Sequence, residues 1–150
     1  MSKPTFYLHP LSGPCRTVLT VAKILNVEME LKKLDLLTQE HLKPEYLKVN
    51  PFHKIPTLVD TDGFTIDESR VIAMYLIESR KPDCFLYPNN DLKKRIQIDR
   101  WLHYDISFSA TISAPMVSES FSSTMTINRI CFSHIISMLY IVDMPFKIIK

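Results

Sequence analysis

One proline-containing segment constrains the fold of this chain more than any other feature. The segment spans residues 50–58 and contains Ile55-Pro56, and Glu68-Ser69-Arg70 follows it about one short hairpin later. An X-Pro bond directly before an apolar, β-branched run predicts a turn that presents Ile55 with its backbone N–H and C=O pointing out of the fold. A helix that begins at Glu68-Ser69-Arg70 would offer free N–H groups and a partial positive charge to a carboxylate. Together these features indicate a site for an extended, peptide-like ligand.

The residues before this segment predict a strand, a helix and a second strand. Residues 5–8 form a short apolar, β-prone run. From Cys15 onward apolar residues recur at helical spacing, and Asn26 follows them as a plausible C-terminal stop. Residues 27–36 alternate loosely between apolar and polar side chains, which favours a second strand. The order strand, helix, strand implies a parallel pair.

A hairpin and a second helix are predicted after Pro56. Residues 57–60 and 64–66 flank Thr61-Asp62-Gly63, a sequence typical of a turn between antiparallel strands. Asp67 is expected to cap the following helix, which would stop before Lys81-Pro82. One face of that helix is expected to carry Val71, Ile72, Tyr75 and Leu76. The order βαβ then ββα, with a proline before the third strand, resembles the α/β thioredoxin-like fold with its mixed sheet.

Composition and charge disfavour several functional classes. The chain has 150 residues and a net charge of +2, and its lysines and arginines are scattered and not interleaved with aromatic residues, so nucleic acid is not an expected partner. The N-terminus lacks the basic flank, long apolar core and cleavage site of a secretory signal. The apolar run at residues 130–142 is shorter than the ~20 residues that span a bilayer, so no membrane partner is expected.

The cysteines favour a reducing compartment. Cys15, Cys84 and Cys131 are far apart and odd in number, which fits neither a disulfide framework nor a Cys-x-x-Cys zinc site. The expected location is therefore cytoplasmic. Ser12-Gly13-Pro14-Cys15 stands where thioredoxin-like oxidoreductases carry Cys-x-x-Cys. Because serine replaces the attacking cysteine, dithiol exchange is not expected, and Cys15 is interpreted as a packed residue.

Four motifs occur in order along the first two thirds of the chain. They are Ser12-Gly13-Pro14-Cys15-Arg16, the EHLKPE sequence at residues 40–45, the NPFHKIPTLVD sequence at residues 50–60, and Glu68-Ser69-Arg70. In this order and spacing they resemble the cytosolic glutathione S-transferases, most closely the insect delta class and its theta-like relatives. The match covers about residues 5–105. The resemblance implies a cytoplasmic homodimer that uses glutathione as co-substrate, holds no metal and conjugates the glutathione thiolate to a small apolar electrophile.

The resemblance makes Ser12 the expected catalytic residue. It matches the family's serine that donates a hydrogen bond to the glutathione sulfur. Such a donor is needed because a thiol with a pKa near ~8.5 is only a few per cent ionised at neutral pH, and the thiolate is the nucleophile. Lowering the thiol pKa by two units requires about 2.7 kcal/mol, which a hydroxyl hydrogen bond and the dipole of the helix near Cys15 could supply together.

The resemblance also implies roles in glutathione binding. His41 and His53 match positions near the glycine carboxylate of glutathione. The backbone of Ile55 matches the residue that pairs with the cysteinyl portion, and Pro56 matches the family's cis-proline. Glu68 and Ser69 match the pair that binds the γ-glutamyl end, and Arg70 matches a neighbouring position in the same site.

Each of these residues also has a structural alternative. Ser12 could be a turn residue ahead of Pro14. His41 and His53 could be exposed loop residues, and no third ligand at short spacing supports a metal site. Glu68-Ser69 could simply occupy the first turn of a helix. The combination of the four motifs favours the glutathione site.

The second half of the chain is expected to depart from the family. After a domain of residues 1–80, residues 81–90 are interpreted as a linker and residues 91–150 as a truncated helical domain. Residues 94–104 are expected to begin its first helix, with inward-facing Ile98, Leu102 and Trp101. From about residue 118 the sequence no longer matches. We hypothesise a truncated or aberrantly spliced form; a gene map showing this tail as a coding exon shared by all products would contradict it.

The sequence predicts two candidate functions and disfavours a third. The leading one is a glutathione S-transferase whose conjugating activity is impaired because the helical domain is truncated. The alternative is a non-catalytic glutathione-binding or dimerisation module of the same fold. A thioredoxin-like redox protein is disfavoured by Ser12.

Overall fold

The computed structural model describes the backbone of residues 2–119 and the side chains of residues 2–104 and Ile106. The chain divides into two compact units, Met1–Lys81 and Pro82–Lys150. Each unit is described by itself. Cys131, the apolar run at residues 130–142 and nearly all of the divergent tail lie outside the described residues.

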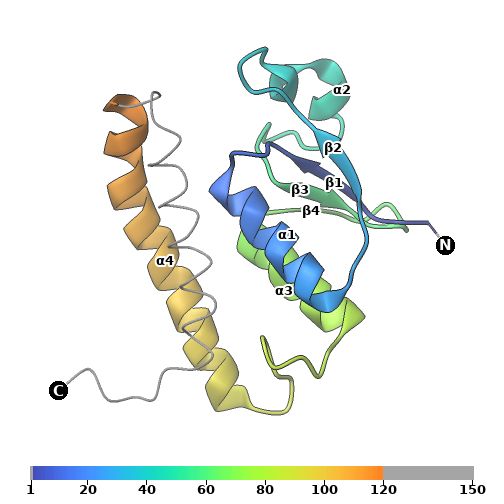
Figure 1. Ribbon diagram of the computed structural model, residues 1–150, viewed down its shortest axis with the longest axis vertical. Helices are drawn as coiled ribbons and strands as arrows, with labels where there is room; N and C mark the ends of the chain where they lie inside the picture. Colours follow the sequence, from blue (N-terminus) through green and yellow to red (C-terminus); the bar gives the residue numbers. More distant parts are fainter. Residues whose placement is uncertain (1, 120–150) are drawn as a thin grey trace. The chain divides into compact units, whose positions relative to one another are not determined.

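A four-stranded mixed sheet organises the first unit. Its strands are β1 (Thr5–Leu8), β2 (Glu30–Lys33), β3 (Thr57–Val59) and β4 (Thr65–Asp67), arranged in the order β2-β1-β3-β4 (Figure 1). β1 pairs with β2 in parallel, and β3 pairs with both β1 and β4 in antiparallel fashion. This arrangement confirms the predicted thioredoxin-like fold and its mixed sheet.

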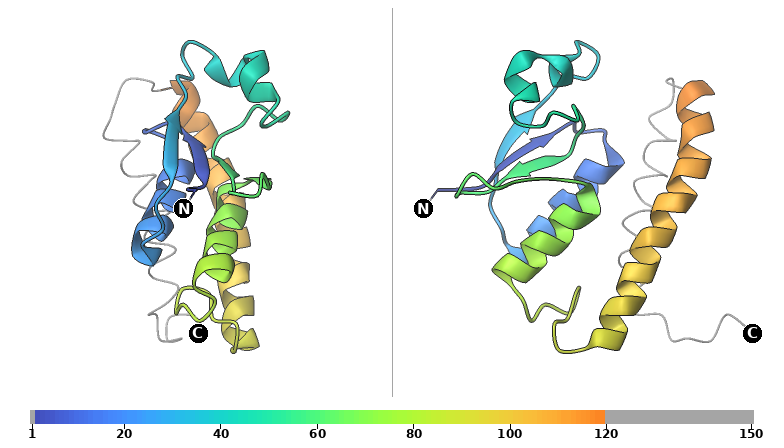
Figure 2. Two further views of the ribbon diagram at one scale, coloured as in Figure 1. Left: turned by 90° about the vertical axis from the view of Figure 1, so that its right-hand side faces the viewer. Right: turned by 180° about the vertical axis from the view of Figure 1, so that it is seen from behind.

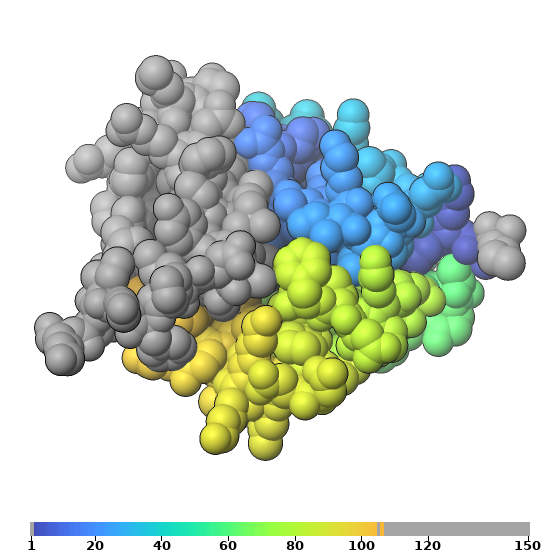
Figure 3. Space-filling model, turned by 60° about the horizontal axis from the view of Figure 1, so that its bottom comes forward, coloured from blue at the N-terminus to red at the C-terminus, as the bar shows by residue number. Residues whose placement is uncertain are grey.

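Two helices cover one face of this sheet. α1 (Gly13–Leu25) and α3 (Ser69–Arg80) run side by side against it (Figures 1 and 2), and their outer surfaces meet in the space-filling view (Figure 3). The register sets Phe6 opposite Leu58 and Leu58 opposite Ile66, so three apolar side chains lie abreast on the covered face. All three are less than 10% exposed, and their burial stabilises the contact between sheet and helices.

The opposite face of the sheet carries Tyr46, which belongs to the short helix α2 (Pro44–Leu47) that follows the 3₁₀ turn η1 (Glu40–Leu42). The ring of Tyr46 contacts the ring of Tyr7, with 5.4 Å between the centroids, and its hydroxyl lies 2.9 Å from the hydroxyl of Thr57. Tyr7 and Thr57 are register partners, and successive residues of a strand point to opposite faces. α2 therefore packs on the side away from α1 and α3.

The second unit contains the long helix α4 (Leu92–Glu119). Asp91 precedes it, and its Oδ1 accepts the backbone N–H of Lys94 at 3.0 Å, which caps the helix start. Ile98 and Leu102 are buried as expected, whereas Trp101 is 36% exposed. In the described part of the chain, no helix is both long enough and apolar enough to cross a membrane.

Local predictions were wrong at three places. The second strand covers only Glu30–Lys33, because its pairing partner β1 is itself only four residues long. Asp67 is not a helix cap, because it pairs with Thr57 at the end of β4. Val71 is 47% exposed, and the buried face of α3 is one position further on, at Ile72, Ala73, Leu76 and Ile77.

Candidate functional site

The loops that carry the candidate residues leave the sheet at one end. The register pairs Leu8 with Lys33, Tyr7 with Thr57, and Thr57 with Asp67. The last residues of β1, β2 and β4 therefore lie at the same edge as the first residue of β3. The loops and helix starts beyond that edge contain Ser12, His41, His53, Ile55, Pro56, Glu68, Ser69 and Arg70.

Ser12 is the N-cap residue of α1. Its backbone is extended, and its Oγ accepts the N–H of Cys15 at 3.4 Å. Pro14 stands in the first turn, where a missing N–H is tolerated. A serine that caps a helix uses an oxygen lone pair, so its O–H proton is left to be donated elsewhere. Ser12 can therefore cap α1 and donate a hydrogen bond to a ligand at the same time.

His41 and His53 come from different segments and meet in space. Their ring centroids are 6.5 Å apart and their planes are inclined by 48°. His53 is exposed and has a backbone φ of 48°, while the Nδ1 atom of His41 is buried and has no hydrogen-bond partner in the structure. Within the described residues, no three His, Cys, Asp or Glu side chains are grouped to hold a metal ion. The pair can instead offer N–H donors to an anion.

Ile55 presents backbone groups at this edge. The Ile55-Pro56 peptide bond is cis, and β3 begins only at Thr57. Among the described turn, loop and cap hydrogen bonds, none uses the N–H or C=O of Ile55. These groups can pair with an extended peptide in the way a neighbouring strand would.

Sequence analysis missed the side chains that support this loop. Tyr46, Asn50 and Thr57 all direct polar atoms at the carbonyl oxygen of Lys54, the residue before Ile55. Asn50 was recognised only as part of a motif, and Tyr46 was not singled out. Their separation of up to 11 residues gives no periodic signal, because the contacts form only when α2 folds onto the sheet.

Glu68 and Ser69 stand where β4 turns into α3. Glu68 is the N-cap residue and is exposed, with φ 65° and ψ 109°, a region that non-glycine residues rarely occupy. Ser69 is buried and begins the helix, and Arg70 is half-buried in its first turn. The first intrahelical bond is made by the N–H of Ile72 to the carbonyl of Glu68, so the N–H groups before it have no intrahelical partner. This helix start can bind a carboxylate.

The edge therefore combines two helix N-termini. α1 begins after β1 and α3 begins after β4, and the ends of β1 and β4 lie at the same edge of the sheet. Each terminus contributes a partial positive charge, and the start of α3 also has N–H groups without an intrahelical partner. The arrangement favours a ligand that is anionic at two places and peptide-like between them.

The thiol of Cys15 is not accessible to a ligand at this edge. Its side chain is fully buried, and burial raises the pKa of its thiol above the ordinary value, with only partial compensation from the hydrogen bond to Ser12. A raised pKa leaves less thiolate at neutral pH. Cys15 is therefore a packing residue, as the sequence indicated.

Comparisons with known proteins give one family. A profile described as the N-terminal domain of glutathione S-transferase matches residues 12–79. Glutathione S-transferase D7 of Anopheles gambiae is 46% identical over 103 residues, which make up 69% of this chain and 46% of that relative.

Solved structures agree with the sequence comparison. A delta-class glutathione transferase of Nilaparvata lugens has a TM-score of 0.69 and 34% identity, covering 91% of this chain and 64% of its own. A glutathione transferase homologue of Drosophila mojavensis, solved with bound glutathione, has a TM-score of 0.66 and 36% identity. The match covers 70% of this chain and 47% of that homologue. This chain spans less than two thirds of the length of each of these three relatives.

Proposed function

The chain belongs to the glutathione S-transferase family, and its residues 12–79 match the N-terminal domain of that family. From this premise we propose that the edge described above binds glutathione. The observation that carries the proposal is the position of Ile55, whose free backbone groups stand at the same sheet edge as the N-termini of α1 and α3. Glutathione is a γ-linked tripeptide: its γ-glutamyl carboxylate suits the start of α3, its thiolate suits the start of α1, and its glycine carboxylate suits the His41–His53 pair. Its chemistry thus matches the edge.

We assign the γ-glutamyl end to the start of α3. The side chain of Glu68 is exposed and can pair with the ligand's ammonium group, while the hydroxyl and the backbone N–H of Ser69 at the helix start can bind its carboxylate. The partial positive charge of the helix end supports the same orientation. Arg70 lies in the same turn and adds a positive charge beside this site.

We assign the glycine carboxylate to His41 and His53. Both are close enough for one carboxylate to contact both rings, since the centroids are 6.5 Å apart. The buried Nδ1 of His41 has no hydrogen-bond partner among the described residues, and a ligand oxygen would satisfy it. The central cysteinyl part would then pair with the N–H and C=O of Ile55 and bring its sulfur towards Ser12.

Ser12 would stabilise the sulfur as a thiolate. Its Oγ accepts the N–H of Cys15 through a lone pair, and its O–H can rotate from the Cys15 thiol to a ligand sulfur. A hydrogen bond to a charged acceptor contributes about 1.5–3 kcal/mol, comparable to the ~2.7 kcal/mol needed to lower a thiol pKa by two units. In the parent reaction this thiolate attacks an electrophilic carbon of a small apolar substrate, the bond from that carbon to its leaving group breaks, and the leaving group departs as an anion, which gives the thioether product. The cytosol is the proposed compartment.

A second candidate is a binding module without conjugating activity. One observation favours it: every residue assigned to glutathione lies in the unit Met1–Lys81, so recognition needs nothing from Pro82 onward. None of these residues, by contrast, is assigned to a pocket for the electrophile. The two candidates agree about glutathione and differ only about turnover.

One comparison tests both candidates. The full chain and its Ser12→Ala and Ser12→Thr variants are measured by calorimetric titration with glutathione and by a conjugation assay with an aromatic electrophile. We expect binding by all three, and turnover, where present, lost in Ser12→Ala and partly kept in Ser12→Thr, which retains the hydroxyl. Binding without turnover in the unsubstituted chain supports the module. Absence of glutathione binding contradicts both candidates, and turnover unchanged in Ser12→Ala contradicts the role of the serine.

A further inference from the structure

Three buried side chains converge on one backbone oxygen beside the proposed site. The carbonyl oxygen of Lys54 lies 2.5 Å from the hydroxyl of Tyr46, 3.1 Å from Nδ2 of Asn50 and 3.1 Å from the hydroxyl of Thr57. All three side chains are at most 3% exposed. Burial raises the pKa of Tyr46, so its hydroxyl stays protonated and able to donate. A carbonyl oxygen has two lone pairs, so its accepting capacity is fully used here.

The three side chains also bind one another. The Thr57 hydroxyl is 2.9 Å from both the Tyr46 hydroxyl and Nδ2 of Asn50. Oδ1 of Asn50 accepts the N–H of Phe52 at 2.9 Å, which ties the start of the loop to the same cluster. Each hydroxyl has one proton, so the bond between Tyr46 and Thr57 forms in place of one of their bonds to Lys54, while Nδ2 of Asn50 has a proton for each of its two contacts. A buried network of this kind holds its members in one arrangement.

This cluster fixes the peptide plane that contains the N–H of Ile55. The Lys54-Ile55 bond is trans, since Ile55-Pro56 is the cis bond of this segment. In a trans peptide the C=O and the following N–H point in opposite directions within one plane. Anchoring the Lys54 oxygen towards the buried cluster therefore aims the Ile55 N–H away from it, towards the edge where the ligand would lie.

The same hydrogen bonds strengthen that N–H as a donor. Hydrogen bonds that accept at a carbonyl polarise the whole amide, so the N–H on the other side becomes a better donor. The burial of Tyr46 and Thr57 enhances the effect because water does not screen it. The cluster thus acts on both the direction and the strength of one hydrogen bond.

We propose that Tyr46, Asn50 and Thr57 are positioning residues for glutathione, acting through the Lys54-Ile55 peptide to aim the Ile55 N–H at the cysteinyl carbonyl of the ligand. The proposal rests on the proposed function above. It goes beyond it by assigning a ligand-binding role to three buried side chains that do not touch the ligand. The alternative is that the cluster serves only to hold the loop in place.

Tyr46→Phe is the most specific variant, because it removes only the hydroxyl that donates to the Lys54 carbonyl and keeps the ring that packs on Tyr7. The matched control is Tyr7→Phe, which removes a hydroxyl that has no described hydrogen bond. We expect Tyr46→Phe to weaken glutathione binding about five- to tenfold and Tyr7→Phe to change it less than about twofold. Both are measured by calorimetric titration on the full chain.

Amide NMR shifts separate positioning from simple loop stability. In the unsubstituted chain, glutathione should shift the amide signals of Ile55 and Ser69. In Tyr46→Phe at saturating glutathione, we expect the Ile55 shift to shrink by about half while the Ser69 shift is retained. A loss of overall stability would alter both sites together or neither, and a ligand analogue distinguishes aiming of the N–H from holding of the loop. Equal Ile55 shifts in the two proteins would overturn the proposal.

A ligand analogue completes the test. In a glutathione analogue whose cysteinyl carbonyl is replaced by a methylene group, the acceptor for the Ile55 N–H is absent. Tyr46→Phe should then weaken analogue binding by less than about twofold, so the effect of the substitution depends on the ligand atom. An unchanged five- to tenfold loss with the analogue contradicts the proposal. If glutathione shifts no amide signal in any protein, the proposed function itself fails, which is a distinct result.

Thr57 gives an independent check if Tyr46→Phe destabilises the fold. Thr57→Ser keeps the hydroxyl and should retain glutathione affinity, whereas Thr57→Val keeps the shape and should lose about fivefold. Thermal unfolding of both variants shows how much of the change is global. Equal affinities for the two variants, with both folded, would count against the positioning role.

Discussion

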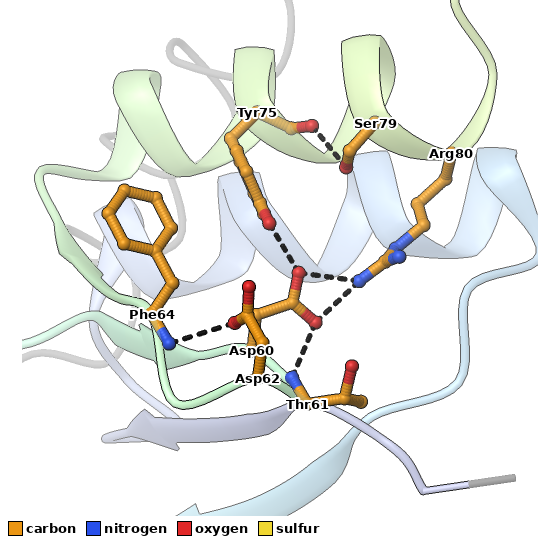
Figure 4. Close-up of polar contacts among 7 residues, drawn as sticks. All are labelled: Asp60, Thr61, Asp62, Phe64, Tyr75, Ser79 and Arg80. Carbon is orange, nitrogen blue, oxygen red and sulfur yellow. Dashed lines mark hydrogen bonds and ion pairs between the residues drawn. The ribbon is translucent and has the colours of Figure 1, made fainter.

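Nη2 of Arg80 contacts both carboxylate oxygens of Asp60, at 2.5 and 2.6 Å, and so joins the end of β3 to the last turn of α3 (Figure 4). The carboxylate also receives hydrogen bonds from the hydroxyl of Tyr75 and from the backbone N–H of Thr61, the latter at 2.7 Å. The Asp60 side chain is only 5% exposed. Because α3 starts at the proposed γ-glutamyl site, this ion pair holds the helix that carries that site.

Removing either partner should destabilise the first unit. We expect Asp60→Asn to lower the free energy of unfolding by about 2 kcal/mol, since Tyr75 and Arg80 lose a charged acceptor in a buried position. Arg80→Gln should cost about 1 kcal/mol, because the Arg80 side chain is 35% exposed and water replaces part of the interaction. Urea unfolding measures both.

The control is Asp62→Asn in the exposed turn, which keeps the acceptor for the N–H of Phe64 and should be nearly neutral. Equal effects of Asp60→Asn and Asp62→Asn would contradict the importance of the ion pair.

The same carboxylate predicts a pH dependence of stability. Burial alone would raise the pKa of Asp60, but the hydrogen bonds from Tyr75 and Thr61 and the charge of Arg80 outweigh it, so the pKa lies below its ordinary value. An unfolded aspartate has a pKa of about 3.9. The contribution of Asp60 is therefore fully present above about pH 4 and is lost as the pH falls through the folded pKa. Urea unfolding at several pH values should show a steeper acid loss in the unsubstituted chain than in Asp60→Asn. Parallel curves would contradict this.

The sequence predicted the regular elements well where local chemistry determines them. The first strand was predicted at the residues where β1 forms, and α1 ends at Leu25 because the next residue, Asn26, has a left-handed backbone with φ 57° that stops the helix. Gly63 and Asp62 likewise form the predicted turn of the hairpin, with the N–H of Gly63 bonded to the carbonyl of Asp60. These features depend on neighbours within a few residues, so the sequence contains the information for them.

Features that depend on tertiary contacts were not predicted. The start of α3 was assigned to Asp67 because aspartate is a good helix cap, but strand pairing with Thr57 holds that residue in β4. Glu68 occupies the N-cap position of α3 instead, and its side chain makes no capping hydrogen bond. The cluster around Lys54 was missed for the same reason: Tyr46 reaches it only after α2 has packed on the sheet.

Cys15 should react slowly with thiol reagents in the folded chain. Its side chain is fully buried, and burial raises the pKa of its thiol, which lowers the thiolate fraction at neutral pH. In a Cys84→Ala/Cys131→Ser background, we expect its reaction with an aromatic disulfide to be on the order of 100-fold slower than that of free cysteine. The rate should rise with urea in step with unfolding. A fast native reaction would instead support a reactive thiol and the redox interpretation.

Glu68 is expected to lower the free energy of unfolding through its backbone conformation while its side chain strengthens ligand binding. It adopts φ 65° and ψ 109°, a backbone conformation that favours glycine and costs about 1–3 kcal/mol for other residues. Glu68→Gly should therefore raise the free energy of unfolding by about 0.5–1 kcal/mol, after allowance for the greater freedom of glycine in the unfolded chain. The same substitution removes the carboxylate proposed to pair with the ligand's ammonium group, so glutathione binding should weaken at least about tenfold.

Glu68→Ala separates the backbone effect from the side-chain effect. Alanine removes the carboxylate but keeps the Cβ atom that disfavours a positive φ, so its stability should stay near that of the unsubstituted chain. Its glutathione affinity should fall as far as that of Glu68→Gly, because both variants lack the same charge. Thermal unfolding and calorimetric titration of the three proteins give the comparison. A gain in stability for Glu68→Ala equal to that for Glu68→Gly would show that the positive φ at this helix start is not the source of the effect.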